Sequence, residues 1–203
     1  MSRPASGAPT AGEPPLDELI ASLTVDVPDY PAPGVLFRDL TPVFADGPAF
    51  RRMVEGLAAP AASDPRAAAV AGLTGRDGDP GFDVVVGVEA RGFLLAAAVA
   101  LGTGVGVVPV RKAGKLPRER IAADYALEYG TATLELHADS VRPGARVLVV
   151  DDVLATGGTL GAAITLVEQL GGIVTAVSVV VELAALGGRE RLAPHAVHAL
   201  WTT

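Results

Sequence analysis

The stretch that decides the fold is Val147-Leu148-Val149-Val150-Asp151-Asp152-Val153-Leu154-Ala155-Thr156-Gly157-Gly158-Thr159. Its first four residues are all aliphatic, which predicts a buried strand over residues 146–150. Two adjacent carboxylates, Asp151 and Asp152, follow, and a loop without bulky side chains comes next. A helix with one apolar face is predicted over residues 158–170, ended by a pair of glycines. A strand that leads through a small-residue loop into a helix is typical of an open parallel sheet.

The same pattern occurs on both sides of this unit. Uninterrupted apolar runs predict strands that are buried on both faces, and a helical run lies between them. We therefore predict an α/β fold with an open, mostly parallel, twisted sheet that carries helices on both faces. The other predicted strands are residues 82–88, 105–110, 173–181 and 196–201, and the other predicted helix of this region is residues 93–101.

The N-terminal part of the chain is less regular. Residues 1–15 are rich in Pro, Ala, Gly and Ser, which predicts a disordered tail in front of a single domain of residues 16–203. Two helices are predicted at the start of that domain: a short one over residues 16–20, and one whose apolar face carries Phe50, Val54 and Leu57.

Two later segments interrupt the alternation of strands and helices. Residues 59–81 form a connection rich in Ala, Pro, Gly and Asp, in which we identify no chemistry. Residues 111–130 are polar and predict a flap. Residues 133–137 alternate apolar and polar side chains, which is typical of a half-exposed strand.

Composition excludes several classes of function. A formal net charge of -7 and an aromatic content of 4% argue against a nucleic-acid surface and against an anionic membrane as partner. The absence of cysteine excludes disulfide scaffolds and thiolate metal sites. The N-terminus has no apolar run typical of a secretory signal, and glycines and a proline break the longest apolar stretch, residues 93–110. We therefore expect a cytoplasmic protein.

The opening motif can bind a sugar phosphate. The loop of residues 155–159 offers backbone amides, two threonine hydroxyls and the start of a helix, all of which favour an oxyanion. It lacks the lysine of a triphosphate-binding loop, so a monophosphate fits better. Carboxylates repel phosphate but accept hydrogen bonds from ribose hydroxyls or bind Mg²⁺. The alternative is purely structural: Thr156 caps the helix and the two aspartates favour its dipole.

The quoted stretch resembles the phosphoribosyl-pyrophosphate signature of the type I phosphoribosyltransferases. Four other segments, in the same order along the chain, resemble the adenine phosphoribosyltransferase family in particular. The resemblance covers residues 30–191 except residues 59–81, which look longer and richer in proline than is usual there. The similar segments are residues 30–39 (YPAPGVLFRD), 89–93 (EARGF), 110–117 (VRKAGKLP) and 127–130 (LEYG).

The resemblance implies an activity and partners. Such an enzyme transfers the 5-phosphoribosyl group of phosphoribosyl pyrophosphate to N9 of adenine, giving AMP and pyrophosphate in purine salvage. It implies Mg²⁺ as cofactor, held mainly by the substrate, and a homodimer without nucleic-acid or membrane partners. It also implies a small N-terminal hood that binds the base and a flap that closes as a lid. The alternatives are another nucleobase phosphoribosyltransferase or a non-catalytic regulator that senses phosphoribosyl pyrophosphate.

The resemblance also assigns roles to residues. Glu128 is the expected catalytic acid/base, and a cis peptide bond between Glu89 and Ala90 is expected to offer an amide to pyrophosphate. The expected ligands of ribose and 5-phosphate are Asp151, Asp152, Ala155, Thr156, Gly157, Gly158 and Thr159. Pyrophosphate is expected to lie near Glu89, Ala90, Arg91, Arg111, Lys112 and Lys115, and adenine near Leu36, Phe37, Arg38 and Leu183.

From the residues alone, each assignment has a simpler alternative. Arg91 and Glu128 could be solvated surface residues, the cations of residues 111–115 a solvated face, and Phe37 a core residue in an irregular segment. His137, His195 and His198 have no metal-ligand spacing, and we assign them no role.

Overall fold

The computed structural model describes residues 12–59, 79–126 and 130–203 of the chain. The chain divides into two compact units, residues 1–50 and residues 51–203. In the described ranges, no helix combines the length and apolar character that a bilayer crossing requires.

The described part of the first unit pairs a short antiparallel ribbon with helices. Strands β1 and β2 pair so that Val25 lies opposite Asp39. The residues buried here are Ile20, Leu40, Val43 and Ala49. The elements are α1 (Leu16–Leu23), β1 (Val25–Pro28), β2 (Leu36–Asp39), α2 (Thr41–Ala45) and the start of α3 (Gly47–Ala58).

Two predictions for these helices are refined. The helix predicted over residues 16–20 is present and continues to Leu23. The predicted face of α3 is right only at Leu57, because Phe50 and Val54 are partly exposed. Ala49 and Met53 are buried with Leu57 at a spacing of four residues, so the apolar stripe lies one position away from the predicted one.

The described part of the second unit contains a seven-stranded sheet in the order β5-β6-β4-β3-β7-β8-β9. The strands β4, β3, β7, β8 and β9 run parallel, and the β5-β6 hairpin joins the β4 edge antiparallel, so the predicted α/β class is confirmed. The bounds are β3 (Val84–Val88), α6 (Arg91–Thr103), β4 (Gly106–Lys112), β5 (Arg120–Ala126), β6 (Thr131–His137), β7 (Arg146–Leu154), α7 (Gly158–Gln169), β8 (Ile173–Glu182), η1 (Ala184–Leu186), α8 (Gly188–Arg191) and β9 (Val197–Thr202).

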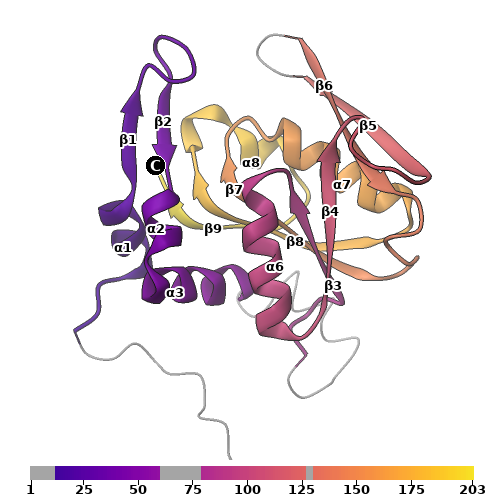
Figure 1. Ribbon diagram of the computed structural model, residues 1–203, viewed down its shortest axis with the longest axis horizontal. Helices are drawn as coiled ribbons and strands as arrows, with labels where there is room; N and C mark the ends of the chain where they lie inside the picture. Colours follow the sequence, from indigo (N-terminus) through magenta and orange to yellow (C-terminus); the bar gives the residue numbers. More distant parts are fainter. Residues whose placement is uncertain (1–11, 60–78, 127–129) are drawn as a thin grey trace, which may run out of the picture. The chain divides into compact units, whose positions relative to one another are not determined.

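The connections reverse direction between β3 and β7. From β3 the chain passes through α6 to β4 on one side, and from β7 it passes through α7 to β8 on the other. Right-handed crossovers in opposite directions place the two helices on opposite faces of the sheet (Figure 1). Side-chain packing agrees, because Gly87 faces α6 whereas Val86 and Val88 belong to the core cluster with α7. Ligands bind at such a switch point, beyond the carboxyl ends of the strands.

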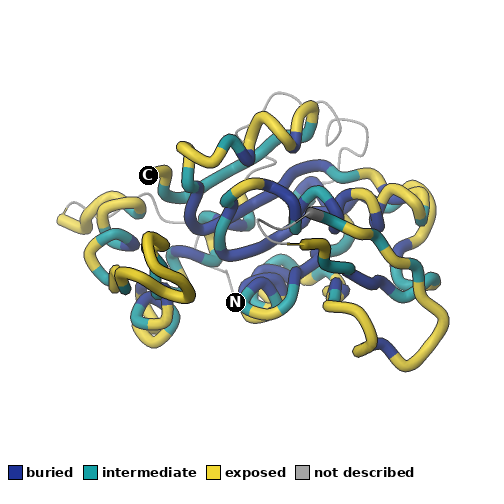
Figure 2. The backbone as a smooth tube through the Cα atoms, turned by 90° about the horizontal axis from the view of Figure 1, so that it is seen from above, coloured by how far each residue is buried: buried dark blue, intermediate teal, exposed yellow. Residues whose placement is uncertain are grey.

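The central strands β3, β7 and β8 are buried along most of their length, and buried segments run through the middle of the molecule in Figure 2. Strand β7 is longer than predicted, because its pairing with β8 continues through Asp151 and Val153 to Leu154. The two aspartates therefore lie in the strand and not after it. The predicted half-exposed strand of residues 133–137 is also wrong at its centre, where Leu134, Glu135 and Leu136 are all buried.

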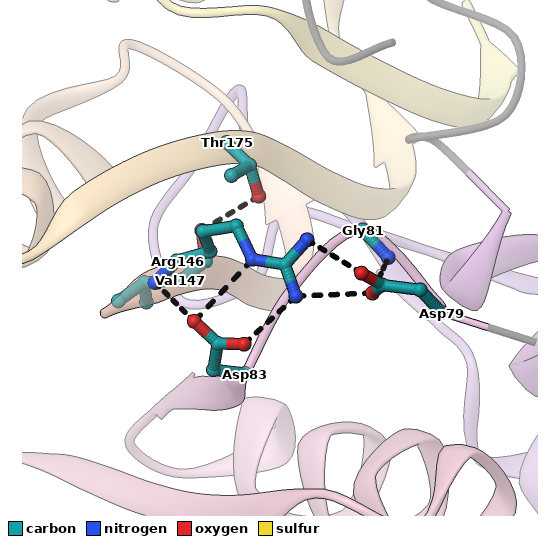
Figure 3. A network of polar contacts seen from close by, with 6 residues as sticks. All are labelled: Asp79, Gly81, Asp83, Arg146, Val147 and Thr175. Atoms are coloured by element: carbon teal, nitrogen blue, oxygen red, sulfur yellow. Dashed lines mark hydrogen bonds and ion pairs between the residues drawn. The ribbon is translucent and has the colours of Figure 1, made fainter. Parts of the chain in front are cut away.

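An ion network fixes the opposite end of β3 and β7 (Figure 3). The Arg146 guanidinium binds both oxygens of Asp79 at 2.9 and 3.0 Å and both oxygens of Asp83 at 3.3 and 2.8 Å. Hydrogen bonds from Arg146, which outweigh the effect of burial, hold the pKa of Asp83 below its ordinary value. The same bonds raise the pKa of Arg146. The network lies far along β7 from the predicted site, so its role is stability.

Replacing Arg146 with Met is expected to lower the free energy of unfolding by about 3 kcal/mol at neutral pH, because two carboxylates lose their common cation. The lowered pKa of Asp83 stabilises the fold above the ordinary aspartate pKa, and this contribution disappears as pH falls through the lowered value. The difference in the free energy of unfolding between wild type and variant should therefore become smaller at acid pH. Urea denaturation at a series of pH values measures it. The Arg118→Met variant breaks only the exposed pair with Asp139 and should change little.

Candidate active site at the switch point

The carboxyl ends of β3 and β7 bring two of the predicted segments together. The strands pair in parallel, with Gly87 beside Val150, so the segments that follow them leave the same edge of the sheet. The segment after β3 begins with Glu89 and a cis peptide bond to Ala90, as predicted, and continues into α6 with Arg91. The Arg91 side chain reaches across to form an ion pair with Asp152.

The two aspartates form a buried acidic pair. Each is only 7% exposed, and the Asp152 backbone amide donates to Asp151 Oδ1 at 2.9 Å. Burial, and then the neighbouring Asp152 charge, raise the pKa of Asp151 well above its usual range. Such a pair favours hydrogen-bond donors and cations as partners, because either relieves the repulsion between the carboxylates. Ribose hydroxyls and Mg²⁺ both meet that description.

The loop after β7 encloses a small cavity. The cavity has a volume of about 80 Å³ and is lined by Asp151 and residues 153–160. Gly157, at φ 78°, is the N-cap residue of α7, and no side chain donates or accepts a capping hydrogen bond there. The structural alternative, in which Thr156 caps the helix, is therefore wrong. The backbone amides of the first turn of α7 point instead toward a loop of small residues, which suits an oxyanion.

Glycines let these segments approach one another closely. A Cβ on Gly92 would lie 2.9 Å from Asp151 Oδ1, so α6 can begin directly against the aspartates. On the other side of the loop, a Cβ on Gly188 would lie 2.2 Å from the Ala155 carbonyl oxygen, and one on Gly157 would lie 2.9 Å from the Gly188 carbonyl oxygen. The sequence reasoning missed Gly188. The adjacent glycines 187 and 188 were the available signal, but nothing local shows what they contact.

Two of the predicted pyrophosphate cations, Arg111 and Lys115, lie beside Glu89. Its carboxylate forms an ion pair with Lys115, accepts from the Lys112 backbone amide at 3.0 Å, and lies 3.4 Å from Arg111 Nε. Burial opposes its ionisation, but the hydrogen bonds from Lys115 and Lys112 and the neighbouring positive charges outweigh burial, so the pKa of Glu89 is lowered. Glu89 therefore stays ionised and pairs with Lys115 and Arg111, while its contact with pyrophosphate stays a prediction.

Leu183 directly follows the carboxyl end of β8, at the same edge of the sheet as the ends of β3 and β7. Its backbone amide donates to the Leu154 carbonyl at 2.9 Å, beside the start of the phosphate loop. The preceding residue, Glu182, is buried and pairs with Arg189, whose Nη1 donates to the Val197 carbonyl at 2.6 Å. The hydrogen bonds that Arg189 donates to the Glu182 carboxylate raise the pKa of Arg189. The end of β8 is thus well fixed.

The other predicted adenine ligands belong to the first unit. Leu36, Phe37 and Arg38 lie in β2, a regular strand and not the irregular segment predicted. The Phe37 ring is partly buried and packs edge-on against Tyr30, with ring centroids 5.2 Å apart, so it is no core residue. Arg38 Nη1 lies 3.3 Å from Asp26 Oδ1 across the ribbon.

Two further predictions concern the catalytic acid/base and the metal. Glu128 lies outside the described residues. Within the described residues, no group of three or more His, Asp or Glu side chains is arranged to hold a metal ion. The Asp151 and Asp152 carboxylates are suitable ligands for Mg²⁺, but two carboxylates leave most of the coordination sphere to other oxygens. This donor set fits a metal ion that a phosphorylated substrate brings with it.

Comparisons of the sequence and of the structure with known proteins all find phosphoribosyltransferases. The sequence pattern of the phosphoribosyl transferase domain matches residues 66–195, which is more than half of the chain. The adenine phosphoribosyltransferase of Salinispora arenicola is 58% identical over 185 residues, covering 91% of this chain and 90% of that protein. The structure is similar to adenine phosphoribosyltransferase from Thermoanaerobacter pseudethanolicus, with a TM-score of 0.79, 44% identity and coverage of 92% and 99%.

A second solved structure was determined with ligands. The adenine phosphoribosyltransferase of Saccharomyces cerevisiae, complexed with an imino-altritol bisphosphate and adenine, is 34% identical with a TM-score of 0.78. The alignment covers 91% of this chain and 98% of that one.

Proposed function

The chain belongs to the adenine phosphoribosyltransferase family, and from this premise we propose that it transfers the 5-phosphoribosyl group of phosphoribosyl pyrophosphate to N9 of adenine. The products are AMP and pyrophosphate, and the reaction is a step of purine salvage. The observation that carries the proposal is the switch-point site, where a buried acidic pair and a small-residue loop occupy one βα turn. The pair suits the hydroxyls of a ribose, and the loop suits its 5-phosphate.

The proposed mechanism uses the two sides of this site differently. Asp151 and Asp152 hold the ribose hydroxyls, while the amides and hydroxyls of residues 155–159 hold the 5-phosphate. The bond from C1 of the ribose to pyrophosphate oxygen breaks as the bond to N9 forms, through an oxocarbenium-like state. Arg91, the Glu89–Ala90 peptide and the cations Arg111, Lys112 and Lys115 stabilise the departing pyrophosphate. When bound with the substrate, Mg²⁺ neutralises part of that charge.

Residues outside this βα turn accept the N9 proton and bind the adenine ring. Glu128 accepts the N9 proton of adenine as the new bond forms. Phe37 stacks on the purine, the backbone of Leu36 and Arg38 reads its edge, and Leu183 covers its other face. Stacking on an aromatic side chain contributes roughly 1–3 kcal/mol per base. The flap excludes water, which would otherwise attack the ribosyl centre.

The proposal is tested by mixing purified protein with adenine, phosphoribosyl pyrophosphate and Mg²⁺ and measuring AMP. AMP formation that requires all three is the expected result. Faster turnover with hypoxanthine, guanine or xanthine would show a different nucleobase transferase. Binding of phosphoribosyl pyrophosphate without any product would show a regulator that has lost the chemistry. Chelation of Mg²⁺ with EDTA should abolish turnover, and added Mg²⁺ should restore it.

We also propose that the enzyme is a cytoplasmic homodimer. The support for a dimer is an apolar surface on the α6 face of the sheet, where Leu101 is 85% exposed and Leu94 is also exposed. Val108 packs in the core on the α7 face, so its neighbours Val107 and Pro109 point to the α6 face, and both are exposed. Exposed apolar side chains gathered on one face are typical of a protein interface. The cysteine-free sequence is compatible with a reducing compartment.

Replacing Leu101 with Glu is expected to convert the dimer to monomer, because a charge on this surface would have to be buried without a partner. We expect the dimer dissociation constant to rise by at least about 100-fold, which corresponds to about 3 kcal/mol. Sedimentation velocity over a range of protein concentrations measures it. Ile173→Glu changes an exposed apolar residue at the start of β8 and should leave the dimer intact. Dissociation by Ile173→Glu, and none by Leu101→Glu, would place the interface elsewhere.

A further inference from the structure

Glu135 is a buried carboxylate that the proposed mechanism does not use. It lies in β6, directly opposite Arg111 of β4, and is only 6% exposed. An ionised group that is buried costs free energy unless hydrogen bonds and an opposite charge compensate it. The partners of Glu135 therefore indicate what the carboxylate is there to hold.

Those partners come from two different segments. Glu135 Oε2 accepts from the Gly114 backbone amide at 3.0 Å, and Glu135 Oε1 pairs with Arg120 Nε at 2.9 Å. Gly114 is in the loop that follows β4, at φ 82°, and Arg120 is the first residue of β5. One carboxylate in β6 thus fixes the loop between β4 and β5 near its start, at Gly114, and at its far end, where β5 begins.

The loop that Glu135 holds follows two of the predicted cations directly and carries the third. Arg111 and Lys112 end β4, and Lys115 is the residue after Gly114. Two other bonds complete the loop: the Ala113 amide donates to the Thr133 carbonyl at 3.0 Å, and Arg111 Nη1 donates to the Lys115 carbonyl at 3.2 Å. The bond from the Gly114 amide to Glu135 ties the backbone to a β6 side chain at the residue directly before Lys115.

We propose that Glu135 is a positioning residue for the pyrophosphate end of the site, an inference that rests on the proposed function. Glu135 touches no substrate. It fixes the Gly114 amide, so that the loop presents Lys115 and Arg111 toward the carboxyl end of β3, where Glu89 meets both side chains. Glu89 binds the side chains of Arg111 and Lys115 directly. Glu135 instead binds the backbone amide of Gly114, which lies next to Lys115 in the chain. Without Glu135, the Gly114 amide and the Arg120 guanidinium lose a buried partner and the loop relaxes.

The role predicts a selective kinetic defect. In Glu135→Ala, kcat/KM for phosphoribosyl pyrophosphate should fall about tenfold, and in the reverse reaction the KM for pyrophosphate should rise by a similar factor. The dissociation constant of AMP, measured by calorimetry without pyrophosphate, should stay within about twofold. Glu135→Gln keeps an oxygen for the Gly114 amide and should recover most of the activity. Asp139→Ala, which breaks an exposed ion pair near the same hairpin, should behave as wild type.

The measurements separate the proposal from its alternatives. A parallel loss of AMP affinity, or equal loss in Gln and Ala variants, would indicate a general structural role and overturn it. Unchanged pyrophosphate kinetics in a folded Ala variant would also overturn it. If that variant does not fold, amide hydrogen exchange in the wild type decides: slow exchange at Gly114 is expected, and exchange at the unprotected rate contradicts the bond. A wild-type enzyme that makes no AMP would refute the proposed function, while the exchange result would still stand.

Discussion

Replacing Glu128 with Gln is expected to lower kcat by about 10²- to 10⁴-fold, the range typical of removing a general acid or base. The amide of glutamine cannot accept the N9 proton of adenine, although it has nearly the same size and can still form hydrogen bonds. The loss should therefore appear in turnover and not in binding. The dissociation constant of AMP is expected to stay within about threefold.

The measurement combines steady-state rates with calorimetry of AMP binding. Glu119→Gln is a matched control, because Glu119 is an exposed glutamate earlier in the same polar segment with no proposed role. Its rates should equal those of wild type. An unchanged kcat in Glu128→Gln would remove Glu128 from the mechanism, and a loss of AMP affinity as large as the loss in kcat would make it a binding residue.

Replacing Gly188 with Ala is expected to raise the KM for phosphoribosyl pyrophosphate by roughly 100-fold, a loss that a displacement of about 1 Å can produce. The added Cβ would lie 2.2 Å from the Ala155 carbonyl oxygen and 2.7 Å from Leu154 Cδ1. Both neighbours are at the start of the phosphate loop, and a backbone carbonyl cannot rotate away as a long side chain can. The loop must therefore shift, and the 5-phosphate should lose contacts.

Gly161→Ala is the matched control for Gly188→Ala. Gly161 lies one turn into α7, and a Cβ there would meet only Leu192 Cδ2, at 3.7 Å, which is an ordinary contact. Alanine also favours a helix over glycine, so this variant should be active and slightly more stable. Steady-state kinetics and thermal denaturation of both variants check the prediction. A normal KM in a stable Gly188→Ala enzyme would show that the loop tolerates the displacement.

The parallel sheet could be predicted because its signal is local. The aliphatic run from Val147 to Val150 and the small-residue loop after it are readable from the sequence alone, and so are the neighbouring strands. The end of β7 was harder to predict, since acidic residues usually leave a strand. Asp151 and Asp152 stay in it because β8 continues to pair alongside. No feature of residues 151–154 reveals that pairing.

The parts of the site that the sequence did not reveal depend on contacts between distant residues. Glu135 resembles any polar residue of an alternating strand until Gly114 and Arg120 are seen on either side of it. Gly188 matters only because Ala155 lies against it. Arg91, Lys115 and Glu89 were predicted as site residues through resemblance to a family, whereas the ion pairs that they form are seen only in the folded chain.

The ion pairs around the switch point affect the free energy of substrate binding, because the cations already have partners before substrate arrives. In the folded chain, Asp152 already holds Arg91, and Glu89 already holds Lys115 and lies near Arg111. In the proposed mechanism, an incoming pyrophosphate group must therefore compete with these carboxylates for the three cations. Binding then exchanges one set of anions around the cations for another. The free energy of binding is the difference between the interactions of the cations with pyrophosphate and their interactions with the carboxylates. Under the proposed mechanism, such an exchange would let a protein of net charge -7 take up a polyanion and still release it after turnover.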